Sequence, residues 1–524
     1  MLYCGLVLVA LVVMMAPTLG APLIERHAWR QCDTASFARG LARGEFDVLH
    51  PRFLAYYPDA YGIDGATESE FNLYPLIVSW LYRLFGVQEW IARAVSLLFS
   101  LATGIWVFLL AKRVYDETAG LLAGLMLALS PLFLFYGRSV QPDAAALSLS
   151  VGALYAMVRW LDDGGWGWFL ASVLMMALGL LTKVTALYMG LALAAALWNK
   201  RRWQALRDWR VWLYGVGVLA PMLLYYAYAR SLFSQSGLTV YGLVGGWPGS
   251  GKFGNWEQLT SLDFYRTMFV RLRSVILSRY VLALAALGLA IRPRREEWPL
   301  YGWLLGMGLF ILFAAQGNRQ HEYYQLPLVP ICCLFGGKAA SALLAPEALK
   351  VDLAFIGKRL GAVIVALALI LSVRGAKAGL DERLRQTDVL LDVALATAEH
   401  TPAGAPVAII HDWARVPEVF YYADRRGWSL WIERDAEGRY GRLIISERVL
   451  GVDGWQVVER LEQDAERIAL LRAQGAERLV VSLEKGDRAA FDAGPIGTEL
   501  AEMYALVAAD DHWLVYDLTS HLQH

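Results

Sequence analysis

The chain has 524 residues, of which 57% are hydrophobic and only 18% are charged. Soluble globular proteins carry about 25% charged residues, so this composition argues against a soluble enzyme and indicates that lipid is the main solvent. Basic and acidic residues both number 48, and this balance gives no indication of a nucleic-acid partner. The four cysteines form no CxxC pair, so neither a disulfide framework nor a zinc site is expected.

Apolar runs long enough to cross a bilayer recur through the first 373 residues. Because a transmembrane helix needs about 20 mainly apolar residues, we expect about eleven spans. They lie near residues 2–20, 90–110, 119–136, 144–161, 166–182, 184–199, 211–229, 275–291, 299–315, 325–344 and 360–373. The first run has no basic residue before it and is long for a signal peptide, so we expect it to be retained as an anchor.

Basic residues in the short loops set the orientation of these spans. They gather after the second, sixth and eighth spans and before the eleventh, at residues 112–113, 200–202, 292–295 and 358–359. If the spans alternate, all four clusters fall on one side, and such clusters are typical of the cytoplasmic face. We therefore predict that the amino terminus lies inside the cell. The first loop (21–89), a mid-chain loop (230–274) and the carboxyl-terminal tail are expected outside.

The carboxyl-terminal tail differs from the rest of the chain in the length of its apolar runs. Its apolar runs shorten to strand length, and a helix-like stretch covers residues 464–474. The expected strands lie at residues 406–410, 442–446, 478–482 and 512–518. Strands that alternate with helices predict a small α/β domain with a largely parallel sheet. The chain is thus divided into an α-helical polytopic membrane domain (1–374) and an extracytoplasmic α/β domain (375–524).

Four polar clusters fall on the predicted outer face of the membrane domain. They are "RHAWRQCDT" (26–34), "ESEFNLYPLIVSWLYRLFG" (68–86), "GRSVQPDA" (137–144) and "NRQHEYYQLPLVP" (318–330). Lys183 lies near the outer end of the fifth span. Taken singly, each cluster is also typical of the charged or aromatic flank of a membrane helix. Together they combine acids, a histidine and cations, which suits a lipid phosphate held beside a carboxylate that acts as a general base.

With these motifs in this order, residues 1–373 resemble the GT-C membrane glycosyltransferases. The likeness is to the branch of the dolichyl-phosphate-mannose protein mannosyltransferases and the bacterial aminoarabinose lipid A transferases. It implies a GT-C-like fold and an enzyme of the bacterial inner membrane that transfers a sugar with inversion on the outer face. The donor would be a polyprenyl-phosphate-linked sugar, and the acceptor a cell-envelope glycan, lipid or protein.

The resemblance also implies roles for single residues. Asp33 would be the general base, and Glu70 would orient the acceptor or hold an ion. The implied donor-phosphate residues are Arg138, Lys183, Arg319 and His321, and the supporting residues are Arg30, Asp143, Tyr323 and Tyr324. Carboxylates and imidazoles such as these suit several divalent ions, but the sequence holds no compact ligand motif. We therefore expect transfer without a metal or another cofactor.

Two departures from the family leave the acceptor open. The lipid A enzymes carry a Lys-Pro-Pro run where this chain reads "FNLYP", and the soluble sugar-binding insertion of the protein mannosyltransferases is absent. A membrane transporter or flippase, an oligosaccharide ligase and a non-enzymatic sensor are alternative functions. Transporters place polar groups at the bilayer midplane on repeated, broken helices, whereas here these groups gather at one face. In the tail, residues 409–428 resemble an appended extracytoplasmic domain in which Asp412 and Arg425 are expected to be structural.

Overall fold

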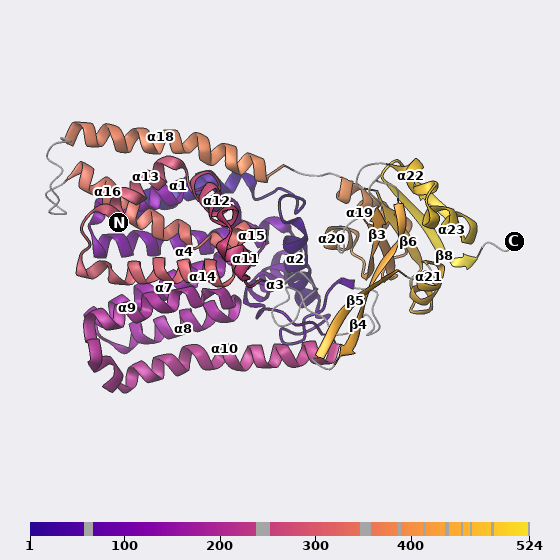
Figure 1. Cartoon of the computed structure of the whole chain (residues 1–524), viewed down its shortest axis with the longest axis horizontal. Helices are drawn as coiled ribbons and strands as arrows, with labels where there is room; N and C mark the ends of the chain where they lie inside the picture. Colours follow the sequence, from indigo (N-terminus) through magenta and orange to yellow (C-terminus); the bar gives the residue numbers. More distant parts are fainter. Residues whose placement is uncertain are drawn as a thin grey trace.

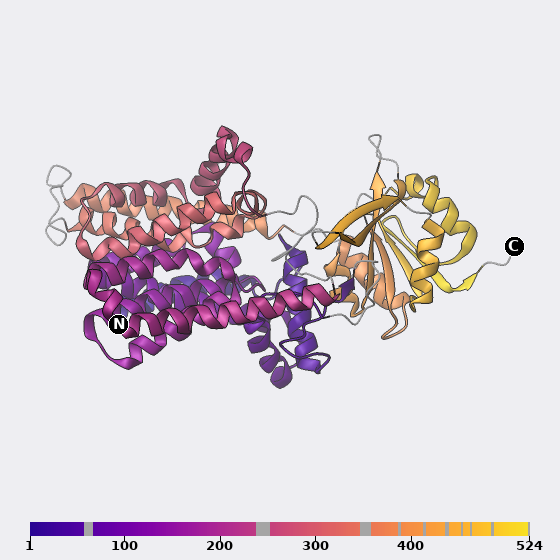
Figure 2. The same ribbon diagram turned by 60° about the horizontal axis from the view of Figure 1, so that its bottom comes forward.

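The computed structural model describes residues 1–56, 66–236, 252–345, 358–385, 389–411, 416–434, 440–451, 454–461, 464–483 and 487–521. It contains a bundle of long helices and a domain built on a β-sheet (Figure 1). Two helices, α2 (Ala28–Arg43) and α3 (Leu73–Phe85), lie between the bundle and the sheet. The same order is seen after rotation about the long axis (Figure 2).

Apolar helices form over each of the eleven predicted spans. The bundle consists of α1 (Leu2–Met15), α4 (Glu89–Val114), α5 (Glu117–Leu127), α6 (Pro131–Tyr136), α7 (Asp143–Asp163), α8 (Trp166–Thr182), α9 (Gly190–Arg201), α10 (Trp209–Ser236), α13 (Arg279–Ala290), α14 (Trp298–Phe313), α16 (Leu328–Leu344) and α18 (Lys358–Arg383). Within the described residues, five helices are long and apolar enough to cross a membrane, and a bent pair raises this number to six. The count of eleven therefore remains a prediction.

Two of the predicted spans are broken into shorter pieces. The third divides into α5 and α6 because Ser130 and Pro131 begin a new helix, with the Ser130 hydroxyl accepting a hydrogen bond from the Phe133 amide at 3.2 Å. The eighth follows α12 (Leu262–Arg271) and a π-helical turn, and the chain bends there by 111° before α13. Short outer helices α11 (Trp256–Thr260) and α15 (Ala315–Gln320) complete this part of the bundle.

Basic residues from two of the four predicted cytoplasmic charge clusters lie at one end of the bundle. Arg113 contacts Asp163 at 3.0 Å, and Lys200 contacts Asp162 at 2.5 Å. These contacts join the ends of α4, α7 and α9, at the end of the bundle away from the sheet domain (Figure 1). The arrangement agrees with the alternation that the sequence predicts, and the assignment of this end to the cytoplasm stays a prediction.

The carboxyl-terminal domain is a mixed sheet, not the largely parallel one that was expected. Its strands are β2 (Val407–His411), β3 (Gly427–Arg434), β4 (Tyr440–Gly451), β5 (Gly454–Leu461), β6 (Arg478–Ser482), β7 (Tyr504–Ala509) and β8 (Trp513–His521). Their order is β5-β4-β3-β2-β6-β8-β7, and only the pairings of β2 with β3 and β6 are parallel along this path. Three of the antiparallel pairings, β3–β4, β4–β5 and β7–β8, join strands that are consecutive in the chain with short connections, which permit hairpins.

Helices cover both faces of this sheet. Helices α19 (Val389–His400) and α20 (Pro417–Ala423) pack on one face, and α21 (Asp464–Ala473), α22 (Arg488–Asp492) and α23 (Pro495–Met503) pack on the other. Strand β2 is buried along its whole length, as a central strand covered on both sides requires. Helix α18 runs to Arg383, past the domain boundary expected at residue 374, and that boundary stays a prediction.

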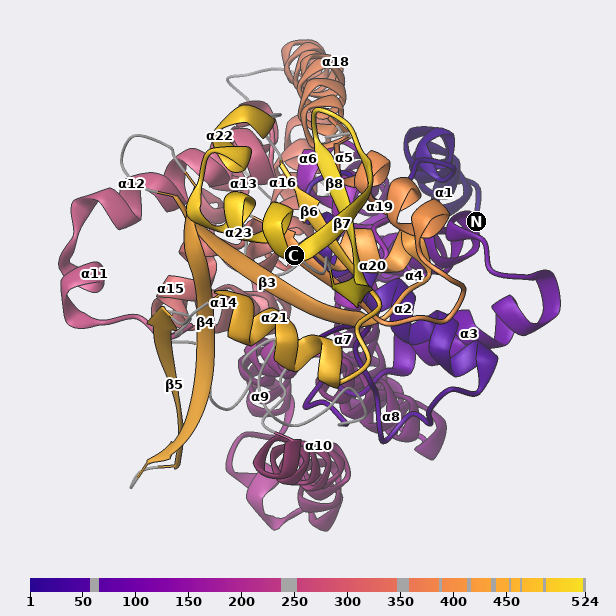
Figure 3. The ribbon, with the colours of Figure 1, turned by 90° about the vertical axis from the view of Figure 1, so that its right-hand side faces the viewer.

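The first outer loop is joined to the sheet domain. Residues Ala55–Tyr56 form a short strand, β1, that pairs in parallel with Gly427–Trp428 of β3. Phe37 of α2 and Phe53 are buried in the same apolar cluster as the α21–α23 side of the sheet. Viewed along the bundle axis, the sheet domain lies in front of α2 (Figure 3). The loop therefore packs against the bundle on one side and the sheet on the other.

Candidate functional site

Five buried side chains meet at the end of the bundle that faces the sheet domain. They come from α2, the segment before α3, the first turn of α7, the residue after α8, and the 3₁₀ turn Glu322–Gln325 before α16. We call this group the Arg30 cluster, and its members are Arg30, Glu70, Asp143, Lys183 and Tyr323. Each is less than a tenth exposed. The structure thus brings together residues that lie almost 300 positions apart in the chain.

Arg30 is at the centre of the contacts. Its Nη2 atom donates to Glu70 Oε2 at 3.3 Å and lies 3.8 Å from Asp143 Oδ2. Its Nη1 atom donates to the Tyr323 hydroxyl at 3.2 Å, and its guanidinium carbon lies 4.9 Å from the centre of that ring. On the other side of Asp143, Lys183 Nζ lies 2.5 Å from Oδ1 and 4.8 Å from the centre of the Tyr323 ring. Two cations and two carboxylates therefore share one buried volume.

The hairpin of α7 and α8 explains how Asp143 and Lys183 come together. The two helices are antiparallel neighbours, so the first turn of α7 lies beside the last turn of α8. A carboxylate at a helix amino terminus and a cation at a carboxyl terminus are each favoured by the helix dipole. A narrow cavity of about 20 Å³ lies beside this pair. Apart from tyrosines and a threonine, its remaining lining is apolar: Ala146, Leu147, Ala186, Phe310, Leu326 and Pro327.

Lys252 is a further cation of the site, and the sequence analysis did not select it. It is partly buried, its carbonyl accepts a hydrogen bond from the Gly317 amide at 3.0 Å, and its ammonium interacts electrostatically with Arg30, Glu70 and Lys183. Burial, helped by the charge of Arg30, lowers the pKa of Lys252 to about 8. One signal was available: no other basic residue occurs between positions 230 and 266 of the predicted outer loop.

A second polar group borders the Arg30 cluster. His27 Nδ1 lies 2.9 Å from the Tyr136 hydroxyl, which donates to Glu322 Oε1 at 3.1 Å. Arg26 and Arg383 also contact Glu322, at 3.1 and 2.9 Å. Burial and the charge of Arg26 lower the pKa of His27 to about 4, so this imidazole is neutral near pH 7.

His321 lies beside the Arg30 cluster, but its charge state does not suit the phosphate-binding role that the resemblance implies. Its ring stacks on Tyr323 with the centres 5.1 Å apart, and the ring of Tyr324 lies 5.9 Å away. Burial, together with the neighbouring His27 and Arg30, lowers the pKa of His321 to about 3, so it is not a cation at neutral pH. Its Nδ1 atom is buried without a hydrogen-bond partner in the described structure. It is therefore suited to a hydrogen bond with a bound ligand, not to neutralising a phosphate.

Two predicted phosphate ligands lie elsewhere. Arg138 is fully buried, with Nη2 2.6 Å from Glu25 Oε2, and Arg93 contacts the other oxygen of Glu25 at 2.7 Å. This Glu25 group is closed, because all three side chains have no exposed area. Arg319 is about half exposed and contacts the exposed Asp263 at 3.2 Å. Spacing alone did not reveal that Glu25 pairs with Arg138.

Asp33, the predicted base, lies on α2 one helical turn after Arg30 and is 3% exposed. Asp33 and Arg30 are three residues apart, so their side chains project from neighbouring parts of one helix face. Among the described residues, no group of three or more His, Cys, Asp or Glu side chains has the arrangement of a metal site. Metal independence stays a prediction.

Comparison with known proteins identifies chains whose sequence or fold is similar to this one. Residues 73–237, which run from α3 through α10, match the family of dolichyl-phosphate-mannose-protein mannosyltransferases. The crystal structure of ArnT from Cupriavidus metallidurans bound to undecaprenyl phosphate matches with a TM-score of 0.62 and covers 98% of this chain and 97% of that one. The chain has the GT-C fold. The identity to ArnT is 15%, and no curated protein sequence matches the chain.

Other GT-C structures are also similar. The oligosaccharyltransferase AglB from Archaeoglobus fulgidus, in complex with an inhibitory peptide and a dolichol-phosphate, has a TM-score of 0.58 at 14% identity over 99% of this chain and 74% of that one. The arabinofuranosyltransferase AftD from Mycobacteria has a TM-score of 0.53 at 15% identity over 99% and 39%. These matches confirm the resemblance and the fold class that the sequence predicts, a GT-C membrane domain followed by a sheet-containing domain.

Proposed function

We propose that this GT-C protein is a membrane glycosyltransferase that transfers a sugar from a polyprenyl-phosphate donor to an acceptor hydroxyl outside the cytoplasm. The observation that carries the proposal is the buried Arg30 cluster beside a cavity with a largely apolar lining. Arginine and lysine bind phosphate oxygens strongly where water is excluded, and the apolar side chains suit the first units of a lipid chain. The family match and the lipid phosphates bound by ArnT and AglB support this use of the fold.

The charge change during transfer gives the cations a catalytic role. A polyprenyl-phosphate sugar is a phosphodiester with one negative charge, and the departing polyprenyl phosphate is a monoester that carries about 1.5 to 2 negative charges at pH 7. Lys183, Arg30 and Lys252 would therefore interact more strongly with the leaving group than with the bound donor. Only such a difference between ground state and transition state lowers the barrier.

Asp33 is the proposed general base. The acceptor oxygen would form a bond to the anomeric carbon from the face opposite the phosphate, the bond from that carbon to the phosphate oxygen would break, and the hydroxyl proton would pass to Asp33. Its position one turn along α2 from Arg30 puts a carboxylate near the proposed phosphate site. Glu70 would hold Arg30 in place through their 3.3 Å contact, so we assign it a positioning role.

The lipid A enzymes carry a lysine shortly after the position of Glu70, and this chain lacks it. Lys183 and Lys252 approach the Glu70–Arg30 pair from α8 and from the segment before α11, so two cations are available without that lysine. Both come from segments outside the first loop. We propose that they replace its contribution to phosphate binding.

A transporter and an oligosaccharide ligase remain alternatives that the same site can test. The charged residues gather at one end of the bundle rather than at its middle, which favours an enzyme of one membrane face over a transporter. An oligosaccharide ligase would place its lipid-linked donor against the same cations, so the number of sugars transferred in the assay separates it from the proposed glycosyltransferase.

Transfer of radiolabelled sugar from a polyprenyl-phosphate sugar to an isolated envelope fraction tests the proposal. Wild-type protein in lipid nanodiscs is expected to transfer the label. The Lys183→Gln variant is expected to bind polyprenyl phosphate at least tenfold more weakly than wild type, because hydrogen bonds to charged groups contribute about 1.5 to 3 kcal/mol. Lys112→Gln is the matched control. That lysine lies in the last turn of α4, is half exposed and pairs with Glu117 in the first turn of α5. A chelator is expected to leave transfer unchanged. Equal loss in both lysine variants, or transport of the lipid without transfer, would contradict the proposal.

A further inference from the structure

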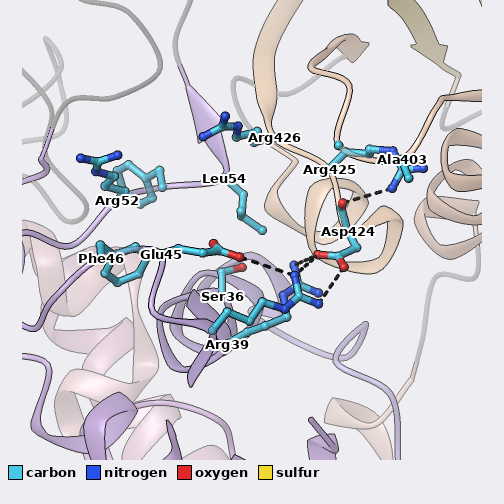
Figure 4. Close-up of a pocket in the computed structure, with 13 residues that line it drawn as sticks. Ser36, Arg39, Glu45, Phe46, Arg52, Leu54, Ala403, Asp424, Arg425 and Arg426 are labelled. Carbon is cyan, nitrogen blue, oxygen red and sulfur yellow. Dashed lines mark hydrogen bonds and ion pairs between the residues drawn. The ribbon is translucent and has the colours of Figure 1, made fainter. Parts of the chain in front are cut away.

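Two cavities of similar size lie at opposite ends of the helix bundle, and their charges are arranged differently. The cavity between the first outer loop and the sheet domain measures about 450 Å³ (Figure 4). There the carboxylate of Asp424 accepts from both terminal nitrogens of Arg43 at 2.8 Å and lies 3.3 Å from Arg39 Nη2. Arg425 donates to the Thr401 carbonyl at 2.7 Å, as expected of a structural residue. These contacts hold α2 and the end of α20 together, which is a structural role.

The second cavity lies where α9 ends and α14 begins, at the end of the bundle away from the sheet domain. Its volume is about 530 Å³, within the usual range for small-ligand sites, and we call it the α9–α14 pocket. Three tryptophans and two arginines are among its lining residues: Trp198, Trp203, Trp298, Arg202 and Arg295. No aspartate or glutamate from the described part of the chain lines it. The pocket is therefore positively charged.

The aromatic rings around the α9–α14 pocket indicate that it lies at the depth of the lipid headgroups. Trp198, Trp203 and Trp298 are 50%, 70% and 56% exposed. Tryptophan rings gather where the hydrocarbon of a bilayer meets the headgroups, because they are apolar and also carry a hydrogen-bond donor. Leu191 lies seven residues before Trp198 and Leu305 seven residues after Trp298, so each exposed leucine shares a helix face with one of these rings. An apolar track thus leads from the pocket along both helices.

Arg295 is held in position by Asn199. Its Nε atom donates to Asn199 Oδ1 at 2.9 Å and its Nη2 atom to the Asn199 carbonyl at 2.7 Å, while the Asn199 side chain donates to the Arg295 carbonyl at 2.9 Å. Its Nη1 group makes no hydrogen bond or ion pair with the described residues. A guanidinium that is already oriented loses little freedom when it binds an anion.

Arg202 has a backbone conformation that favours glycine. It ends α9 with a φ of 48°, and a side chain in this left-handed region strains the backbone. The side chain is exposed and makes no hydrogen bond or ion pair within the described ranges, so no contact in the protein compensates for the strain. A glycine would suit the same turn without that cost. An arginine at this position therefore indicates that its guanidinium binds something other than the protein itself.

We propose that the α9–α14 pocket binds the phosphate of a membrane phospholipid that has a net negative charge. Arg202 and Arg295 bind the phosphate oxygens, the tryptophan rings cover the glycerol part, and the acyl chains follow the apolar track. A zwitterionic headgroup would bring its cation beside the two arginines, so the pocket favours the anionic lipid. The site lies at the end of the bundle opposite the Arg30 cluster, and the inference does not depend on the proposed function.

Lipid binding is measured on the full-length protein in detergent by native mass spectrometry. Phosphatidylglycerol and phosphatidylcholine with identical acyl chains are titrated separately, with polyprenyl phosphate present so that the proposed donor site does not compete. We expect wild type to bind phosphatidylglycerol about tenfold more tightly than phosphatidylcholine, because the two arginines attract a net negative charge. Glycerol 3-phosphate carries the phosphate without acyl chains, and we expect that it does not displace the lipid.

Two variants and one control identify the pocket. Arg202→Gly is expected to weaken the binding of phosphatidylglycerol about tenfold, the equivalent of one hydrogen bond to a charged group. Arg295→Gln should weaken it as well, although this variant also removes the bonds to Asn199. Arg207→Gln is the matched control, because Arg207 is exposed in the same 3₁₀ turn (Arg202–Arg207) and lies outside the lining of the pocket. We expect this control to bind phosphatidylglycerol as wild type does.

Thermal unfolding separates a ligand-binding arginine from a structural one. Without added lipid, Arg202→Gly should unfold at the same temperature as wild type or higher, because glycine adopts the left-handed conformation without strain. Phosphatidylglycerol should raise the unfolding temperature of wild type and of Arg207→Gln, since a ligand that binds only the folded state stabilises it. It should raise that of Arg202→Gly much less.

Three results would each overturn the assignment. Equal affinity of Arg202→Gly and Arg207→Gln for phosphatidylglycerol would show that the lipid responds to the overall charge of this end and not to the pocket. Displacement of the lipid by glycerol 3-phosphate would make the pocket a site for soluble phosphates. A lower unfolding temperature of Arg202→Gly without lipid would show that the arginine stabilises the fold itself.

Discussion

Two buried groups of charges in this protein include residues that lie only a few positions apart in sequence, and a cavity adjoins one of the two groups. In the Glu25 group, one carboxylate accepts from Arg93 and Arg138 at 2.7 and 2.6 Å, and none of the three side chains is exposed. In the Arg30 cluster, contacts range from 2.5 to 3.8 Å, and a cavity adjoins the pair of Asp143 and Lys183. A charge group with no exposed side chain indicates a structural role, whereas a buried charge cluster beside a cavity indicates a binding site.

The comparison also shows what a sequence motif can conceal. Arg138 and Asp143 belong to one motif, "GRSVQPDA", yet Arg138 joins the Glu25 group and Asp143 joins the Arg30 cluster. The turn between α6 and α7 separates them, because Arg138 precedes the new helix and Asp143 is in its first turn. Neighbouring residues of a motif can therefore belong to different networks, and only the fold shows which.

The largest expected effect is on turnover. Asp33→Asn should reduce sugar transfer by about 10² to 10⁴-fold, the usual contribution of a general base, while binding of polyprenyl phosphate and the unfolding temperature remain unchanged. Transfer rate and lipid binding are measured on the same preparation. Asp263→Asn is the control, because Asp263 is exposed and pairs with Arg319. Transfer by Asp33→Asn within a fewfold of wild type would remove Asp33 from the mechanism.

The next effect is on stability and separates the two charge groups. Glu25→Gln leaves Arg93 and Arg138 buried without their carboxylate, and removing one partner of a buried pair costs about 3 to 5 kcal/mol. We expect a marked fall in the unfolding temperature of this variant, measured by tryptophan fluorescence. Lys183→Gln should weaken lipid binding and lower the unfolding temperature much less. A Glu25→Gln protein with normal stability but weakened lipid binding would place the Glu25 group in the donor site.

Much of the architecture was predictable because it follows from strong local signals. The apolar runs, the charge clusters at one end and the strands at residues 407–411 and 478–482 each follow from composition or periodicity. Asp143, Lys183 and Tyr323 were also selected from the sequence, and the structure places them around Arg30, while their roles stay predictions. Their selection depended on a motif order that resembles a known family, and each motif alone is equally typical of a membrane flank.

The remainder depends on contacts between distant segments. Whether Arg138 meets a phosphate or Glu25 depends on how α1 and α7 pack, and no local pattern contains that information. Lys252 lies in an irregular segment, and its place beside Lys183 depends on how that segment returns to the bundle. The pairing of β1 with β3 joins residues some 370 positions apart, so the contact between the first loop and the sheet domain could not be predicted from the sequence.

A smaller effect is expected on the pH dependence of lipid binding. Lys252 has a lowered pKa of about 8, so its ammonium is charged below pH 8 and becomes neutral as the pH rises through that value. Affinity for polyprenyl phosphate should fall by about tenfold from pH 7 to pH 10, the equivalent of one hydrogen bond to a charged group. Lys252→Arg should abolish this decline, because arginine keeps its charge. An identical decline in both proteins would show that Lys252 does not contact the phosphate.

The smallest effect concerns Arg319, and it tests whether the Arg30 cluster has been delimited correctly. The side chain is 49% exposed, pairs with the exposed Asp263 and lies two residues before His321. Exposed ion pairs contribute little, about 0 to 1 kcal/mol, so Arg319→Ala should change neither stability nor lipid affinity by more than about twofold. His321→Ala is the informative partner, because it removes the ring that stacks on Tyr323 and an imidazole whose Nδ1 atom has no partner in the described structure. That variant should weaken donor binding. A loss of affinity in Arg319→Ala as large as in Lys183→Gln would mean that the bound lipid draws α15 inward, and the site would then include the exposed face of this helix.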